Sequence, residues 1–146
     1  LPEIFMILIF LQIIFGAFVS GMDAGKIYNS WPLMGNSFFP DDNKITNLFK
    51  FSALSDPSLV QYMHRNMAYL IFVLYIIIAF TVYKNKILPL FKPILILGFV
   101  VFLQIILGIL TLLSGAGILI SSLHQFSSIL LITASLYFLY KNKFSF

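Results

Sequence analysis

Two histidines, His64 and His124, are the residues in this sequence best suited to chemistry. The first lies in the segment VQYMHRNMAYL (Val60–Leu70) and the second in SSLHQFSSILL (Ser121–Leu131), each near the start of a long apolar stretch. An ionisable side chain near hydrocarbon is costly, so it is by default a functional candidate that needs a partner. Imidazole is also a common metal ligand. The two histidines are therefore candidates for a shared ligand.

The composition indicates what must position them. Hydrophobic residues make up 60% of the 146 residues, charged residues make up 10%, and the mean hydropathy is +1.00. These values are typical of an integral membrane protein. A spanning helix needs about 20 residues. We therefore expect an all-α membrane protein in which residues 1–146 form a single four-helix transmembrane bundle, with helices over about 2–20, 57–83, 93–114 and 122–140.

Charge and cysteine usage exclude several functions. The net charge of +4 comes mostly from lysines at helix ends, which indicates orientation in a lipid bilayer and no nucleic-acid partner. The chain has no cysteine, which excludes disulfides, thiolate metal sites and covalently attached c-type haem.

Local signals set the helix ends. Asp56 and Pro57 form an N-cap and first-turn pair for the second helix, Pro93 is expected to open the third, and Ser122 is a candidate cap for the fourth. Gln12 falls in mid-membrane, where an interhelical hydrogen bond is favoured over a substrate contact.

The first and second helices are joined by a long outer loop, residues 22–56, which is rich in aromatic residues and holds four of the five acidic ones. A loop of this length is usually functional or disordered, and its aromatic residues argue against disorder. We interpret it as a lid over the bundle or a cap lying on the membrane interface.

The lysines predict the orientation. Five of them, without acidic neighbours, mark the cytoplasmic side, so both histidines belong to the outer half: Lys84, Lys86, Lys92, Lys141 and Lys143. The first apolar run lacks a basic region and a cleavage site, so we do not expect a signal peptide. Because the chain starts at Leu1, we expect its beginning to be missing.

The histidines share a depth and a repeat. His64 lies 19 residues before Tyr83 and His124 lies 16 before Tyr140, which is roughly 28 Å and 24 Å along a helix. The motif LQIIFG (Leu11–Gly16) recurs as LQIILG (Leu103–Gly108), which predicts two tandem helix-pair repeats related by an axis along the membrane normal. This arrangement favours one flat ligand between the imidazoles, and we hypothesise an axially ligated haem.

Other interpretations remain open. The histidines are also compatible with interfacial hydrogen bonding or with zinc or non-haem iron, for which the outer carboxylates would have to supply further ligands: Asp23, Asp41, Asp42 and Asp56. Arg65 is suited to a haem propionate, because a guanidinium binds a carboxylate through two hydrogen bonds. Snorkelling of Arg65 to lipid headgroups is about equally favoured.

Three stretches carry a family resemblance: GAFVSGMDAGKIYNSWPLMG (Gly16–Gly35), VQYMHRNMAYL and SSLHQFSSILL. Together they resemble the C-terminal half of haem A synthase (heme A synthase), and the pattern GxDAGxxYNSWPLM is the most specific part. The resemblance covers essentially the whole chain. It implies a b-type haem (haem b) whose iron is ligated at the positions of His64 and His124. Gln61 stands where the substrate half has a glutamate, which supports assignment to the other half.

The resemblance also implies a function. The complete protein would be an oxidoreductase of haem biosynthesis, serving cytochrome oxidase assembly, that converts the haem O methyl group to the formyl group of haem A. Haem O bound by the missing N-terminal half, haem O synthase, and a quinone or other electron acceptor would be its partners. We expect a bacterial inner membrane, with a mitochondrial inner membrane as the alternative, and the haem site towards the periplasmic side. The functional alternatives are a general bis-histidine membrane cytochrome b that carries electrons, and a metal-free structural or transporter half.

Overall fold

The computed structural model describes residues 1–144, and within that range it is helical and contains no strand. The long helices are α1 (Pro2–Gly21), α2 (Pro57–Lys84), α3 (Phe91–Leu113) and α4 (Ile118–Phe144). Each is long and apolar enough to cross a membrane. The predicted fold class, an all-α integral membrane protein with four spanning helices, is confirmed. The last two residues of the predicted domain lie outside the described range.

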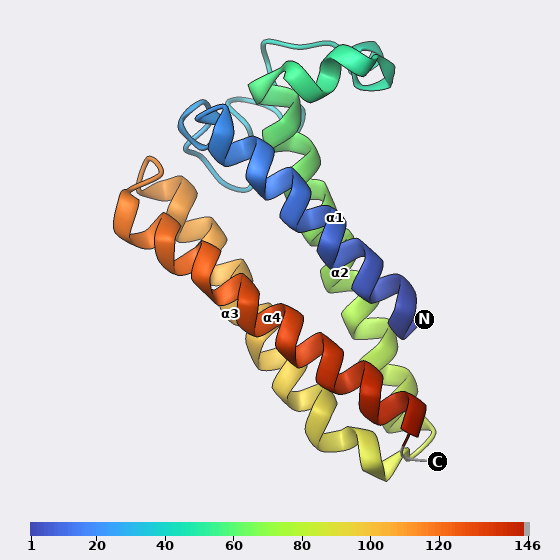
Figure 1. Cartoon of the computed structure of the whole chain (residues 1–146). Coiled ribbons are helices and arrows are strands. Elements are labelled where there is room, and N and C mark those ends of the chain that lie inside the picture. Colours follow the sequence, from blue (N-terminus) through green and yellow to red (C-terminus); the bar gives the residue numbers. More distant parts are fainter. Residues whose placement is uncertain (145–146) are drawn as a thin grey trace.

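The helices associate as two antiparallel pairs, α1 with α2 and α3 with α4 (Figure 1). Both termini lie at the end of the molecule that holds the α2–α3 turn, and residues 22–56 lie at the opposite end (Figure 1). The ribbons of the two pairs approach each other near the termini and separate towards the loop end (Figure 1). The predicted tandem repeat stays a prediction, although the pairing of helices agrees with it.

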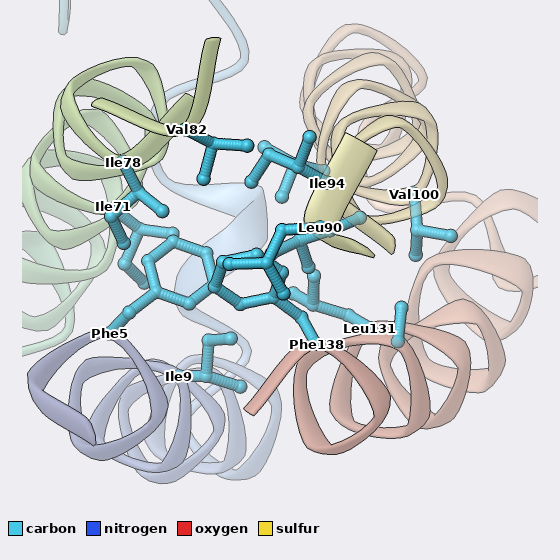
Figure 2. Close-up of a cluster of buried hydrophobic side chains, with 13 residues drawn as sticks. Phe5, Ile9, Ile71, Ile78, Val82, Leu90, Ile94, Val100, Leu131 and Phe138 are labelled. Carbon is cyan, nitrogen blue, oxygen red and sulfur yellow. The ribbon is translucent and has the colours of Figure 1, made fainter. Parts of the chain in front are cut away.

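The hydrophobic core occupies the half of the bundle nearer the termini. Figure 2 shows side chains from all four helices meeting there: Phe5, Ile9, Ile71, Ile78, Val82, Leu90, Ile94, Leu97, Val100, Val101, Leu131, Ala134 and Phe138. Lipid tails are as apolar as these residues, so close packing stabilises such a core more than transfer from water does. Tyr75 packs so tightly that a Cβ at Gly98 would lie 1.9 Å from its hydroxyl oxygen.

The start of α2 agrees with its sequence signals. The Asp56 carboxylate accepts a hydrogen bond from the backbone N–H of Leu59 at 3.1 Å, and Pro57 is the first helical residue. This satisfies one of the N–H groups that a helix start leaves unpaired. The predicted cap of α2 is confirmed, and the ends of α1 and α2 lie within one residue of the predicted ones.

Two other predicted helix starts are wrong. The short 3₁₀ helix η4 (Leu88–Leu90) runs directly into α3 at Phe91, so Pro93 lies inside the first turn and does not open the helix. Helix α4 begins at Ile118, so Ser122 is no cap. The chain reverses immediately before Ile118, because Gly115 and Ala116 both have positive φ and the Ser114 hydroxyl accepts a hydrogen bond from Gly117 N–H at 3.1 Å.

The end of α4 is also later than predicted, at Phe144 and not at residue 140. Lys141 and Lys143 belong to its last turn, where cations are favoured by the negative end of the helix dipole. The helix therefore continues past its apolar segment.

The outer loop is ordered around three 3₁₀ helices: η1 (Ala24–Lys26), η2 (Ile45–Phe49) and η3 (Phe51–Ser55). Its first part, residues 22–42, folds back on the outer end of α2, and we name it the proximal loop. The Trp31 indole N–H donates to the Tyr69 hydroxyl at 3.1 Å, and the rings of Phe38 and Phe39 pack against Tyr62. Residues 44–55, with η2 and η3, form a separate segment that we name the distal arm.

Candidate functional site

His64 lies where α2 packs against α1. The side-chain amide of Gln12 lies 3.3 Å from Nε2 of His64 and forms a hydrogen bond with it across the two helices; its direction depends on the tautomer of the ring. One turn further along α1, a Cβ added to Gly16 would lie 3.3 Å from Cε1 of the imidazole. The interhelical hydrogen bond expected of Gln12 is confirmed. The absence of a side chain at Gly16 lets the imidazole approach the backbone of α1 closely.

His124 is placed in the same way on the other pair. A Cβ added to Gly108 of α3 would lie 3.2 Å from Cε1 of His124. Gln104 precedes Gly108 by one turn, as Gln12 precedes Gly16, and its Oε1 is buried. Both imidazoles thus lie beyond the hydrophobic core and against a glycine of the neighbouring helix.

Several buried polar atoms around these side chains have no hydrogen-bond partner in the described part of the chain. They include Nδ1 of both histidines and Oε1 of both glutamines, Gln12 and Gln104. Buried polar atoms in native proteins are nearly always paired, so each exception requires an explanation. Unpaired atoms of this kind are what a site completed by a bound group would leave.

The donor set fits a haem. A porphyrin supplies four ligands, so the protein must supply only one or two axial ones, and imidazole is a common axial ligand. Two imidazoles, one from each helix pair, meet that requirement. Within residues 1–144 no group of three or more His, Asp or Glu side chains is arranged to hold a metal ion. The assignment of His64 and His124 as iron ligands stays a prediction.

The four aspartates of the outer loop bind other residues of the loop or of the start of α2. Asp23 pairs with Lys26 at 2.7 Å, and Asp42 accepts hydrogen bonds from the hydroxyls of Tyr28 at 2.9 Å and Ser58 at 2.6 Å. Burial and this contact with Asp42 raise the pKa of Tyr28 above its ordinary value of 10.0.

The other two aspartates have similar partners. Asp41 accepts from the N–H of Asn36 at 2.7 Å, and Asp56 caps α2. The zinc and non-haem iron interpretations, which needed these carboxylates as ligands, therefore gain no support.

Arg65 fastens the proximal loop to α2. Its side chain is only 7% exposed, and its guanidinium donates to the carbonyl oxygens of Tyr28 and Ser30, both at 2.9 Å. Snorkelling to headgroups is therefore wrong, because the cation is buried under the loop. Its Nε has no partner among the described residues, and the predicted contact with a propionate stays a prediction.

Three residues of this region had no role assigned from the sequence. The Gln61 amide donates to the Tyr28 carbonyl at 3.0 Å, beside Arg65, and so also holds the loop. Gly16 and Gly108 line the imidazoles. Their identical place at the end of the LQIIFG and LQIILG motifs is the signal from which they could have been identified.

The fold and the site define a four-helix membrane protein with a candidate site between two helix pairs. Comparison with known proteins identifies the family of this chain. Residues 3–136 match the COX15-CtaA family model, described as cytochrome oxidase assembly protein, and the chain belongs to this family.

Three relatives are each named heme A synthase. The protein of Pelagibacter ubique (strain HTCC1062) is 43% identical over 97% of this chain and 43% of its own length. Those of Rickettsia prowazekii (strain Madrid E) and Wolbachia pipientis wMel are 40% and 41% identical, over 92% and 93% of this chain and 40% and 37% of their own lengths. The chain thus spans less than half the length of these relatives. No solved structure matches it.

Proposed function

We propose that this chain is the haem b-binding, C-terminal half of a haem A synthase. The whole enzyme would be an oxidoreductase that converts the methyl group of haem O to the formyl group of haem A. The observation that carries the proposal is the pair of imidazoles, each against a glycine and each with a buried, unpartnered Nδ1. Family membership supports it, and so does 43% identity, over 97% of this chain, to a protein named heme A synthase.

In this proposal each residue of the site has a separate role. His64 and His124, one from each helix pair, would hold the iron, and Gln12, whose amide lies 3.3 Å from Nε2 of His64, would orient that imidazole. Gly16 and Gly108 let the rings lie against helix backbone. A haem bound in this way supplies one-electron transfer. Arg65 and Gln61 hold the proximal loop over the outer end of α2, which keeps water from that side of the site.

The partners and the location follow from the same proposal. Haem O would be bound by the N-terminal half, delivered by haem O synthase, and a quinone would accept electrons. The five lysines without acidic neighbours lie at the ends of α2 and α4, in the α2–α3 turn and in the first turn of α3, away from the histidines. By the positive-inside rule this supports a haem site towards the periplasmic side of a bacterial inner membrane.

The proposal is tested by separating the halves. The purified chain, reconstituted with haem O and an electron partner, should form no haem A. Co-expression with the N-terminal half of a relative should restore formation of haem A, and the His64→Ala variant should reduce it. Appreciable haem A from the chain alone would contradict the division of labour between halves.

A further inference from the structure

The distal arm carries the most exposed aromatic side chains of the outer loop. Phe49 is 88% exposed, Phe51 is 90% exposed, and Ile45 is 63% exposed. Two lysines, Lys44 and Lys50, lie among them, and residues 43–55 contain no acidic residue. Three large apolar side chains so close together in sequence and so fully exposed suggest a surface that is covered in the protein's own environment.

The opposite side of the arm is polar. A cleft of about 450 Å³ separates it from the start of α2. Its lining combines the apolar residues Ala53, Pro57 and Leu59 with six polar ones: Asn43, Asn47, Lys50, Ser52, Ser55 and Asp56. Asn43 donates to the Asp56 carboxylate at 3.0 Å and also accepts from Asn47 at 3.1 Å. The arm is therefore amphipathic, and its polar side is fixed to the cap of α2.

The position of the arm along the membrane normal can be estimated. Helix α2 spans 28 residues from Pro57 to Lys84, which is roughly 40 Å along the helix. A bilayer with its headgroups is about 40–45 Å thick. If Lys84 lies among the inner headgroups, Pro57 lies among the outer ones, and the arm joins α2 at that level. Figure 1 shows the arm extending sideways from the end of α2, away from the other helices.

We propose that the distal arm binds the outer surface of the bilayer, with Phe49 and Phe51 inserted at the boundary between headgroups and acyl chains. Lys44 would pair with lipid phosphates, since basic residues beside apolar ones are the usual composition of interfacial segments. Lys50 donates to Asn47 at 2.8 Å on the polar side of the arm. The length of α2 places the arm at the level of the outer headgroups, so the bilayer is the covering partner that this position provides. The arm thereby fixes the tilt of α2 and the height of the proximal loop over the histidines.

The experiment places a single tryptophan on the arm. In a Trp31→Phe background, Phe49→Trp and Phe51→Trp are compared with Ser52→Trp on the polar side, all as the full chain in phospholipid vesicles. We expect the first two to show blue-shifted emission, a large loss of emission with lipids brominated high in the acyl chain, and little loss with acrylamide. Ser52→Trp should show the opposite pattern.

Two results would overturn the proposal. Quenching of residues 49 and 51 by acrylamide, as strong as that of residue 52, would place the arm in water. Protection from both quenchers would mean that protein covers the arm, for example a second copy of the chain. In anionic vesicles, Lys44→Gln should make the emission of the tryptophan at residue 49 or 51 less blue-shifted than it is with Lys44 present. Because none of these readouts involves haem, the result is independent of the proposed function.

Discussion

Gly16 and His64 are in such close contact that a single methyl group at residue 16 would lie 3.3 Å from Cε1 of the imidazole. Gly108 has the same relationship to His124, at 3.2 Å. Distances of this size are tighter than ordinary van der Waals contact, so an added Cβ must displace the ring. The site therefore depends on two helix positions where only glycine fits without movement.

Gly16→Ala and Gly108→Ala should each weaken haem binding or convert low-spin iron to high-spin, because the displaced imidazole no longer reaches its position. Alanine favours a helix over glycine by about 1 kcal/mol, so the thermal stability of the apo chain should not fall. Haem titration followed by optical spectroscopy, beside thermal unfolding in detergent, measures both effects.

Gly21→Ala is the matched control, since nothing lies within 4 Å of a Cβ at that position. It should leave the haem spectrum unchanged. If Gly21→Ala impaired binding as much as Gly16→Ala did, crowding of the imidazole would not be the cause.

Arg65→Met should detach the proximal loop from α2. It removes the Arg65 donors to the carbonyls of Tyr28 and Ser30, and only the Tyr28 carbonyl keeps another donor, Gln61, so the loss costs about 2 kcal/mol. Arg65→Lys keeps the charge but loses the planar fork, so the loss should be smaller. Hydrogen exchange of residues 28–33 measures the opening of the loop. Unchanged protection in Arg65→Met would show that other contacts suffice.

Gly98→Ala should destabilise the bundle, since its Cβ would lie 1.9 Å from the Tyr75 hydroxyl oxygen. Overpacking of this kind costs about 2 kcal/mol. In a Tyr75→Leu background the same substitution should cost less, because the obstructing hydroxyl is gone. Thermal unfolding in detergent of the wild type, the two single variants and the double variant gives the coupling free energy between residues 75 and 98. Equal costs of Gly98→Ala in both backgrounds would refute the contact between Gly98 and Tyr75.

Alkaline pH should loosen the proximal loop through Tyr28. Burial and Asp42 raise the pKa of Tyr28, so the neutral hydroxyl stabilises the folded loop. That contribution is complete below the ordinary value of 10.0 and is lost as the pH rises through the higher folded pKa. Trp31 emission should therefore change above pH 10.0 in the wild type. The change should be reduced in Tyr28→Phe, and an identical titration would exclude Tyr28 as its source.

Sequence reasoning predicted this fold well because a spanning helix needs a continuous apolar run, which is easy to recognise in a single sequence. The start of α2 was predicted correctly from Asp56 and Pro57, because the capping of unpaired N–H groups depends only on residues next to the helix end. The start of α4 at Ile118 was missed, because it depends on positive φ at Ala116, a residue type that rarely signals such a turn.

The candidate site could be predicted from the sequence only in part. The two histidines were recognisable from their type and depth, whereas the role of Arg65 as a loop anchor was not. Its partners are backbone carbonyls more than 30 residues away in the chain, and backbone acceptors leave no trace in the identity of side chains. Contacts of this kind become visible only in three dimensions.

The most direct test of the proposed function is the reduced-minus-oxidised optical difference spectrum of the detergent-purified chain, beside His64→Ala and His124→Ala. We predict a low-spin b-type spectrum in the wild type that is lost or becomes high-spin in both variants. A folded wild type that stays colourless after expression with ample haem would contradict the account. A spectrum that survives both substitutions would do so as well.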